Sequence, residues 1–201
     1  PELVEQIVSG KVQLQRGGEL RETTVLFSDI RGFTQWTEAH QPSHIVSILN
    51  DYFELMVDAI HRHHGTLDKF MGDGMLAVFD LDVLPDARRI AIEAAVELRD
   101  RIEAMNAERA ANRLPLTGFT LGLHAGDVLY GNIGGKSRLD FTVIGQAANI
   151  AARLGDYGKT IGHRIVVSRD ILTETAEAKP LGHVKLHNVS QPVESFAIAA
   201  D

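Results

Sequence analysis

The feature of the sequence that most constrains its fold is a tight turn, Gly72-Asp73-Gly74, between two short apolar runs. The runs are residues 66–71 (TLDKFM) and 75–79 (MLAVF). Asp-Gly between apolar runs is a strong hairpin signal, because both residues tolerate the backbone conformation of a tight turn. We therefore predict two antiparallel strands joined at Asp73, around which the other elements must be arranged.

Amphipathic helices are predicted on both sides of this hairpin. One begins at Pro42 and is stopped by Gly65, and the other begins at Pro85. Their apolar residues recur at helical spacing. They are Ile45, Ile48, Leu49, Tyr52, Leu55, Met56, Ala59 and Ile60 in the first helix, and Ile90, Ala91, Ala94, Ala95, Leu98, Ile102 and Met105 in the second.

Short β-branched or alternating runs predict the other strands. The expected elements are strands at 23–28 and 119–125, a turn at 126–127 into 128–130, a polar loop or arm at 131–140, a strand at 141–144, a helix at 145–154, and strands at 165–168, 183–187 and 193–198. Strand, helix, hairpin, helix, strand is the ferredoxin-like βαββαβ order. We expect one α/β (α+β) domain over residues 19–201, with an antiparallel-rich sheet flanked by helices and α/β additions at its C-terminal end. Residues 1–18 are expected to be a helix or linker, or a frayed terminus.

Composition excludes several functional classes. There is no cysteine, so thiolate catalysis, cysteine-bound zinc and disulfides are ruled out. A net charge of −7 argues against a dedicated nucleic-acid binder. No apolar run approaches the length that spans a membrane, and no secretory leader is visible. We expect a cytoplasmic domain, whether or not the parent protein is bound to a membrane. The start at Pro1, without Met, indicates a fragment of a longer protein, in which we expect a regulatory domain upstream.

Two aspartates lie at predicted strand ends. Asp29 ends the strand at 23–28, and Asp73 lies in the hairpin turn. Neighbouring strands would bring both carboxylates to one end of the sheet, where oxygen ligands suit Mg²⁺ or Mn²⁺. The alternative is a turn or helix-capping role for each aspartate. Residues 30–34 then lead into a short helix through Trp36, whose start favours phosphate.

Three segments resemble the catalytic domain of class III nucleotidyl cyclases: FSDIRGFT (27–34), KFMGDGMLAVF (69–79) and DFTVIGQAANIAARL (140–154). The resemblance covers about residues 20–198. It implies that Asp29, Asp73 and the carbonyl of Ile30 hold two Mg²⁺ or Mn²⁺ ions. It also implies that the 3′-hydroxyl of a nucleoside triphosphate attacks the α-phosphate and releases pyrophosphate.

Two residues match the family's base-reading positions and resemble a bacterial adenylyl cyclase subset. Lys69 stands where adenylyl cyclases carry Lys and guanylyl cyclases carry Glu, and Thr142 occupies the second position. Adenine N1 is an acceptor and suits an ammonium donor, whereas guanine N1–H is a donor. The resemblance therefore implies ATP as substrate. The alternative for Lys69 is a solvated strand residue.

Other matched positions are expected to contact the sugar and phosphates. Asn149 and Arg153 share one helix face, and the resemblance implies that they orient the ribose and stabilise charge on the α-phosphate. The alternative is that both residues are ordinary polar side chains on the solvent-exposed side of the helix. The remaining candidates are Phe33 and Thr34 in the phosphate loop, and Arg138, Lys185 and His187 near the terminal phosphates. Lys185 and His187 are expected on one strand face, although Val184-Lys185-Leu186-His187-Asn188 departs from the family's Leu-Lys-Gly motif.

The family builds its site between two domains, and this chain carries both residue sets, so a homodimer with shared sites is implied. Two alternatives stay open: a guanylyl or mixed-specificity cyclase, and a catalytically silent nucleotide-binding regulatory module. His61, His63 and His64 cluster at the end of a predicted helix. The helix dipole favours histidine at this position. We prefer this explanation of the cluster to a metal site.

Overall fold

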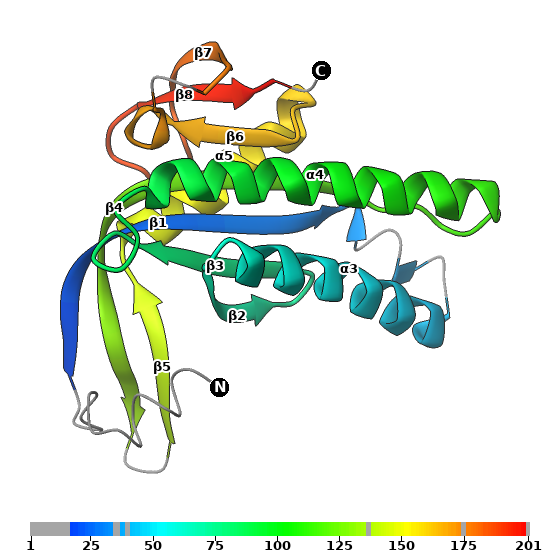
Figure 1. Cartoon of the computed structure of the whole chain (residues 1–201), viewed down its shortest axis with the longest axis horizontal. Coiled ribbons are helices and arrows are strands. Elements are labelled where there is room, and N and C mark those ends of the chain that lie inside the picture. The colour runs from blue at the N-terminus through cyan, green and yellow to red at the C-terminus, as the bar shows by residue number, and fades with distance from the viewer. Residues whose placement is uncertain (1–16, 34–36, 39–40, 136–137, 174–175, 200–201) are drawn as a thin grey trace.

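The computed structural model describes residues 17–33, 37–38, 41–135, 138–173 and 176–199 (Figure 1). For residues 132–141 it describes the backbone and not the side chains. The predictions for residues 1–16 and for the short helix at residues 34–36 therefore lie outside the described residues. Gly17 and Gly18, predicted to belong to the helix or linker, instead begin strand β1. Where the chain is described, no helix has both the length and the apolar character needed to cross a membrane.

An eight-stranded sheet forms the centre of the fold, with strand order β2-β3-β1-β4-β6-β8-β7 and β5 paired to β4. The β4–β6 pair is parallel and the other pairs are antiparallel. The strands are β1 (Gly17–Arg31), β2 (Thr66–Met71), β3 (Gly74–Asp80), β4 (Gly118–Gly135), β5 (Arg138–Ile144), β6 (Ile165–Ser168), β7 (Ala178–Val184) and β8 (Val193–Ile198). The helices are α3 (Pro42–Arg62), α4 (Ala87–Ala111), α5 (Gln146–Ile161) and the short η1 (Arg169–Ile171).

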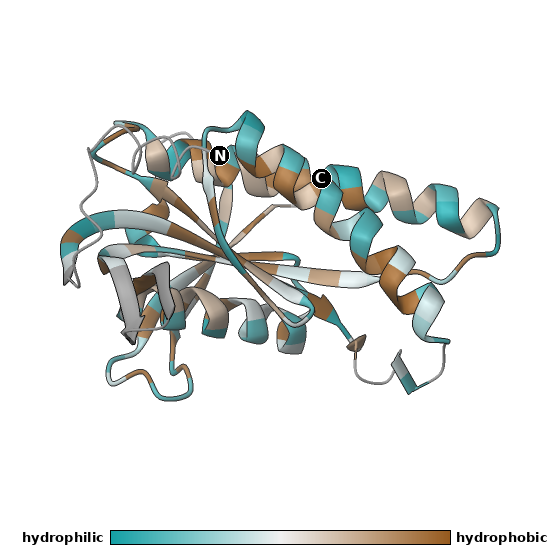
Figure 2. Ribbon diagram, turned by 90° about the horizontal axis from the view of Figure 1, so that it is seen from below, coloured by the Kyte–Doolittle hydropathy of each residue, from teal (hydrophilic) through white to brown (hydrophobic). Residues whose placement is uncertain are grey.

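Helices cover both faces of the sheet, which is seen nearly edge-on in Figure 2 with hydrophobic residues along its strands. Successive residues of β1 serve opposite faces, because side chains alternate along a strand. Leu26 packs in the cluster that contains α3 and α4, and Val25 packs in the cluster that contains Ala147 of α5. The predicted mixed α/β fold, antiparallel-rich and flanked by helices, is confirmed.

The predicted turn at Gly126-Asp127 is wrong, because β4 runs unbroken from Gly118 to Gly135. A Gly-Asp pair can stay extended when its partner strand continues beside it. Here Thr23 pairs with Gly126 and Glu22 with Asp127, so β1 continues the ladder through this point. In the expected arm at 131–140, the described residues 131–135 and 138–140 are likewise strand: the end of β4 pairs with β5 from Gly135↔Arg138 onward.

The predicted strand at 183–187 is wrong at its end, because β7 runs from Ala178 to Val184. The chain then turns, with Asn188 at φ 59° and Val189 N–H donating to the Leu186 carbonyl at 3.2 Å. Leu186 and Val189 are buried in the cluster that contains Leu154 of α5. Their burial explains why the chain leaves the strand direction.

Close approach of α5 to β4 depends on Gly122. A Cβ atom at this position would lie 1.9 Å from the carbonyl oxygen of Ala151 and 2.5 Å from the nitrogen of Gly155. Any side chain would therefore force the helix away from the sheet. This contact fixes the height of α5 above the end of β1.

Candidate active site

Asp29 and Asp73 are neighbours at one end of the sheet. β1 pairs with β3 up to Ser28↔Met75, so the end of β1 meets the turn between β2 and β3. Burial raises the pKa of Asp73 to about 6, with further contributions from the charge of Asp29 and a hydrogen bond to it. The predicted proximity of the two carboxyl groups is therefore observed.

Gly74 allows the turn to lie this close to β1. A Cβ atom on Gly74 would stand 2.7 Å from the backbone oxygen of Ser28, a contact that real Cβ atoms do not make. The hairpin can therefore reach the residue before Asp29 only with glycine here. Turn chemistry explains both the strand reversal and the position of Asp73.

The ammonium of Lys159, on α5, contacts the carboxylate of Asp29. It also lies 3.2 Å from Asp156 Oδ1, and the Lys159 carbonyl accepts a 3.1 Å hydrogen bond from Arg31 Nη2. Burial alone would lower the pKa of Lys159, but the hydrogen bonds and charges of Asp29 and Asp156 raise it overall. Sequence reasoning missed Lys159, because 130 residues separate it from Asp29.

The donor set fits a hard divalent cation. Asp29, Asp73 and the Ile30 carbonyl offer only oxygen, the ligand type that Mg²⁺ and Mn²⁺ prefer. Two adjacent carboxyl groups, one with a raised pKa, would be stabilised by a nearby cation. Across the described residues, no group of three or more His, Asp or Glu side chains is arranged around a metal position. Backbone and substrate oxygens would therefore have to complete the coordination.

Lys69 and Thr142 come together although 73 positions separate them in the sequence. Lys69 Nζ donates a hydrogen bond to Thr142 Oγ1, and Thr142 Oγ1 donates to Asp68 Oδ2 at 3.0 Å. Thr142 is 8% exposed and the Lys69 side chain 39% exposed. Lys69 therefore contacts Thr142 of β5 while its side chain stays partly open to solvent.

Asn149 and Arg153 lie on α5 as predicted, with Asn149 exposed and Arg153 half-buried. Arg153 Nη1 pairs with Asp156 Oδ2 at 3.0 Å, and Asp156 in turn contacts Lys159. Among the residues that the structure describes, no hydrogen bond or ion pair joins Asn149 or Arg153 directly to the two aspartates. In the part of the chain that the structure describes, Arg153 is linked to Asp29 through Asp156 and Lys159.

The structure describes the remaining candidates only in part. Ile30 is buried, and Phe33 packs against the α3–α4 side of the core. Thr34 and the side chain of Arg138 lie outside what the structure describes. Lys185 and His187 are exposed beyond the end of β7, so their expected position on one strand face is wrong. The early end of β7 is the reason.

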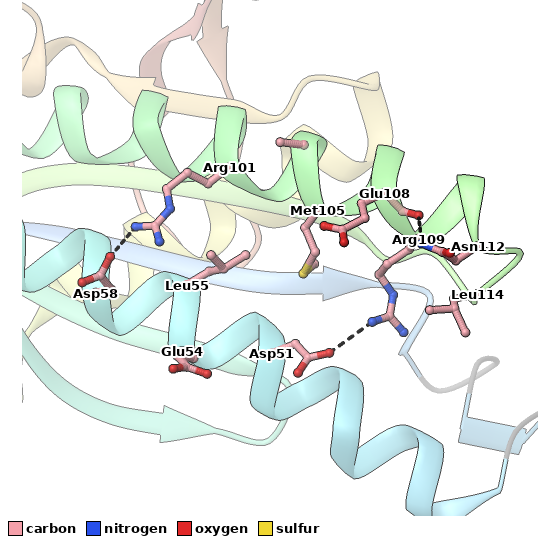
Figure 3. Close-up of a pocket in the computed structure, with 11 residues that line it drawn as sticks. Asp51, Glu54, Leu55, Asp58, Arg101, Met105, Glu108, Arg109, Asn112 and Leu114 are labelled. Atoms are coloured by element: carbon pink, nitrogen blue, oxygen red, sulfur yellow. Dashed lines mark hydrogen bonds and ion pairs between the residues drawn. The ribbon is translucent and has the colours of Figure 1, made fainter.

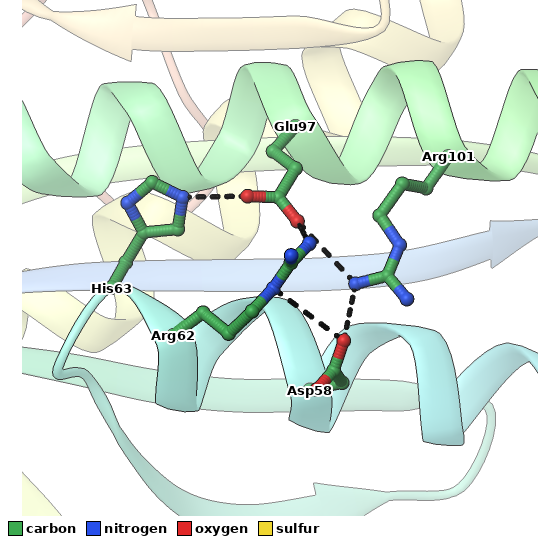
Figure 4. A network of polar contacts seen from close by, with 5 residues as sticks. All are labelled: Asp58, Arg62, His63, Glu97 and Arg101. Carbon is green, nitrogen blue, oxygen red and sulfur yellow. Dashed lines mark hydrogen bonds and ion pairs between the residues drawn. The ribbon is translucent and has the colours of Figure 1, made fainter.

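The histidines at the end of α3 belong to a different surface. His63 Nε2 lies 2.8 Å from Glu97 Oε2 of α4, within a network that includes Arg62, Asp58 and Arg101 (Figure 4). This network joins α3 to α4 and holds no metal arrangement within the described residues.

A groove of about 760 Å³ also lies between α3 and α4, crossed by the Asp58–Arg101 and Asp51–Arg109 ion pairs (Figure 3). Its lining contains none of the candidate active-site residues.

Comparisons with known proteins identify the family of this chain. The family described as "Adenylate and Guanylate cyclase catalytic domain" matches residues 17–198. The chain is 36% identical to an uncharacterized protein of Mycobacterium tuberculosis over 90% of its own length, and 37% identical to an adenylate cyclase of Anabaena cylindrica over 76%. It spans about a third of these curated relatives, 32% and 30% of their lengths.

Solved structures include both kinds of cyclase. A bacterial light-regulated adenylyl cyclase superposes with a TM-score of 0.88 at 24% identity, covering 98% of this chain and 57% of that one. The guanylyl cyclase Cya2 superposes with a TM-score of 0.81 at 32% identity, covering 91% and 94%. The family match, the fold and the paired aspartates agree, and this chain belongs to the adenylate and guanylate cyclase catalytic domain family.

Proposed function

We propose that this domain converts ATP to 3′,5′-cyclic AMP and pyrophosphate. The observation that carries the proposal is the contact between Lys69 and Thr142, which joins a donor and a hydroxyl at one point on the sheet. Lys69 would donate to adenine N1, and Thr142 would accept from the 6-amino group. The same pair would not match guanine. Guanine carries a hydrogen-bond donor at N1, facing the donor Lys69, and an acceptor at position 6, facing the acceptor Thr142.

In the reaction, a bond forms between the ribose 3′-oxygen and the α-phosphorus, and the bond from that phosphorus to the bridging oxygen of pyrophosphate breaks. The 3′-hydroxyl proton is released to solvent. Arg153 would donate to the oxygens on which negative charge develops, and Asn149 would orient the ribose. Bound Mg²⁺ or Mn²⁺ ions would supply charge neutralisation of the triphosphate and activation of the 3′-hydroxyl.

A shared site in a homodimer is part of the proposal. Within one chain Arg153 has no direct contact with Asp29 or Asp73 among the described residues, so a second copy would have to supply it. An apolar row supports such pairing: Leu20, Leu129 and Ile144 are cross-strand neighbours and are 67%, 38% and 50% exposed. Phe70 and Met71 add exposed apolar surface on edge strand β2, 47% and 51%. Such surface is typical of an interface.

A product assay tests the proposal. The purified chain is incubated with Mn²⁺ and either ATP or GTP, and the cyclic nucleotides are quantified. Cyclic AMP is expected to be the main product. Asp29→Asn and Asp73→Asn should each lower the rate at least about 10²-fold in a folded protein, because metal-assisted activation supplies several kcal/mol.

Other outcomes would point to the alternatives. Cyclic GMP as the main product would favour a guanylyl cyclase, consistent with the similarity to Cya2. No product from either nucleotide would favour a silent nucleotide-binding module. Near-wild-type activity in a folded Asp29→Asn protein would contradict the metal assignment.

A further inference from the structure

Asp68 lies beneath the Lys69–Thr142 pair and contacts both members. Its Oδ2 accepts the hydrogen bond from Thr142 Oγ1 at 3.0 Å and lies 3.2 Å from Lys69 Nζ. Its Oδ1 accepts from the backbone N–H of Val143 at 3.3 Å. The Asp68 side chain is only 4% exposed.

A β-bulge makes this arrangement possible. Consecutive residues of a regular strand point to opposite faces, so Asp68 and Lys69 should not reach the same group. The pairing of β2 with β3 shifts between Leu67 and Lys69, which leaves Asp68 as the extra residue. Bulges re-aim side chains in this way. Both Asp68 and Lys69 therefore meet Thr142.

The hydrogen bonds fix the polarity of the Thr142 hydroxyl. A threonine hydroxyl has one hydrogen to donate and two lone pairs that accept. Asp68 takes the hydrogen and Lys69 donates to one lone pair. What remains on Oγ1 is one lone pair, which can only accept. An adenine 6-amino group satisfies it, whereas the 6-oxo group of guanine would face it as acceptor against acceptor.

We infer that Asp68 is a specificity-determining positioning residue, which selects adenine over guanine by holding Thr142 as an acceptor and Lys69 beside it. The inference rests on the proposed function. Asp68 itself would not touch the nucleotide, since its two oxygens are used by Thr142, Val143 and Lys69. Replacing its carboxylate with an amide would let the amide donate to Thr142 and release the hydroxyl hydrogen toward the base.

The test compares ATP, GTP and purine riboside 5′-triphosphate, which lacks the 6-amino group, as substrates for wild type, Asp68→Asn and the control Asp82→Asn. Asp82 is exposed in the loop between β3 and α4. Wild type and Asp82→Asn are expected to prefer ATP over both other nucleotides. In Asp68→Asn the ATP:GTP and ATP:purine ratios of kcat/KM should each fall at least about tenfold, the size of one well-placed hydrogen bond.

The outcomes separate this inference from the proposed function. Suppose that the wild type prefers ATP. If the ratios are unchanged in folded Asp68→Asn, or if this variant loses rate equally on all three nucleotides, the inference about Asp68 is overturned and the proposed function stands. If Asp68→Asn does not fold, the wild type decides: equal use of ATP and purine riboside triphosphate would overturn the acceptor role of Thr142. If the wild type forms no cyclic nucleotide, the proposed function fails. Competition of the three nucleotides against a fluorescent ATP analogue then tests the same ratios as binding constants.

Discussion

The Lys159 ammonium group lies against the Asp29 carboxylate, so one of the two candidate metal-binding carboxylates is paired with a side chain of its own chain. A divalent cation at Asp29 would have to compete with this positive charge. The Lys159 side chain is 28% exposed and the Asp29 side chain 21% exposed, so the pair is only partly screened by water.

We therefore expect Lys159→Met to bind Mn²⁺ more tightly than wild type, by about two- to fivefold, the range expected from partly exposed ion pairs. Titration calorimetry with Mn²⁺ measures this without any turnover. Lys185→Met, which removes an exposed lysine beyond β7, should leave Mn²⁺ affinity unchanged. Weaker Mn²⁺ binding in Lys159→Met would show that Lys159 supports the site and does not compete with the metal.

Mixing two inactive variants tests the shared site. Asp73→Ala and Arg153→Ala each damage both sites of a homodimer, but a mixed dimer has one site with both lesions and one intact site. Activity should return to about a quarter of wild type when subunits exchange randomly, because half of the dimers are mixed. Native mass spectrometry verifies the exchange. Continued inactivity after verified exchange would mean that both residue sets act within one chain.

Stability should fall below neutral pH, partly because of His124. Burial lowers the pKa of His124, although the charge of Asp170 opposes the shift. His124 Nδ1 lies 2.7 Å from Ser168 Oγ. The unfolded chain therefore binds the proton more readily than the folded chain. Stability present above pH 6.5 is lost as the pH falls through the unfolded pKa toward the lower folded value.

His124→Gln should show a smaller drop in melting temperature between pH 7 and pH 5 than wild type. His183→Gln, at an exposed position on β7, should retain the wild-type drop. The same drop in both variants would show that His124 does not contribute to acid sensitivity.

Packing of α5 on β4 should depend on Gly122. Gly122→Ala places a methyl group on the Ala151 backbone and should cost about 1–3 kcal/mol, or a melting temperature lower by about 2–4 °C per kcal/mol. Gly126→Ala is the matched control on the same strand, since its nearest atom is the side-chain Nε2 of His124 at 3.4 Å. Equal melting temperatures in the two variants would contradict the close contact at Gly122.

The sequence alone determined the helices and turns that depend only on residues close together in the chain. Helical periodicity placed α3 and most of α4, and turn chemistry placed the hairpin that carries Asp73. The turn of a hairpin lies at one end of the sheet, and the strand that pairs beside it has a residue at that same end. The approach of Asp29 to Asp73 could therefore also be predicted. These inferences need only the residues within one element and its turns.

Tertiary structure decided what depends on partners distant in the chain. β4 continues through Gly126 because β1 runs alongside it, and β7 ends early because Leu186 and Val189 are buried. The bulge at Asp68 aims two consecutive side chains at Thr142, which strand alternation argues against. Lys159 reaches Asp29 because glycine contacts bring α5 close to the sheet. Backbone register and packing distance set these contacts, and neither is encoded in the local pattern of residues.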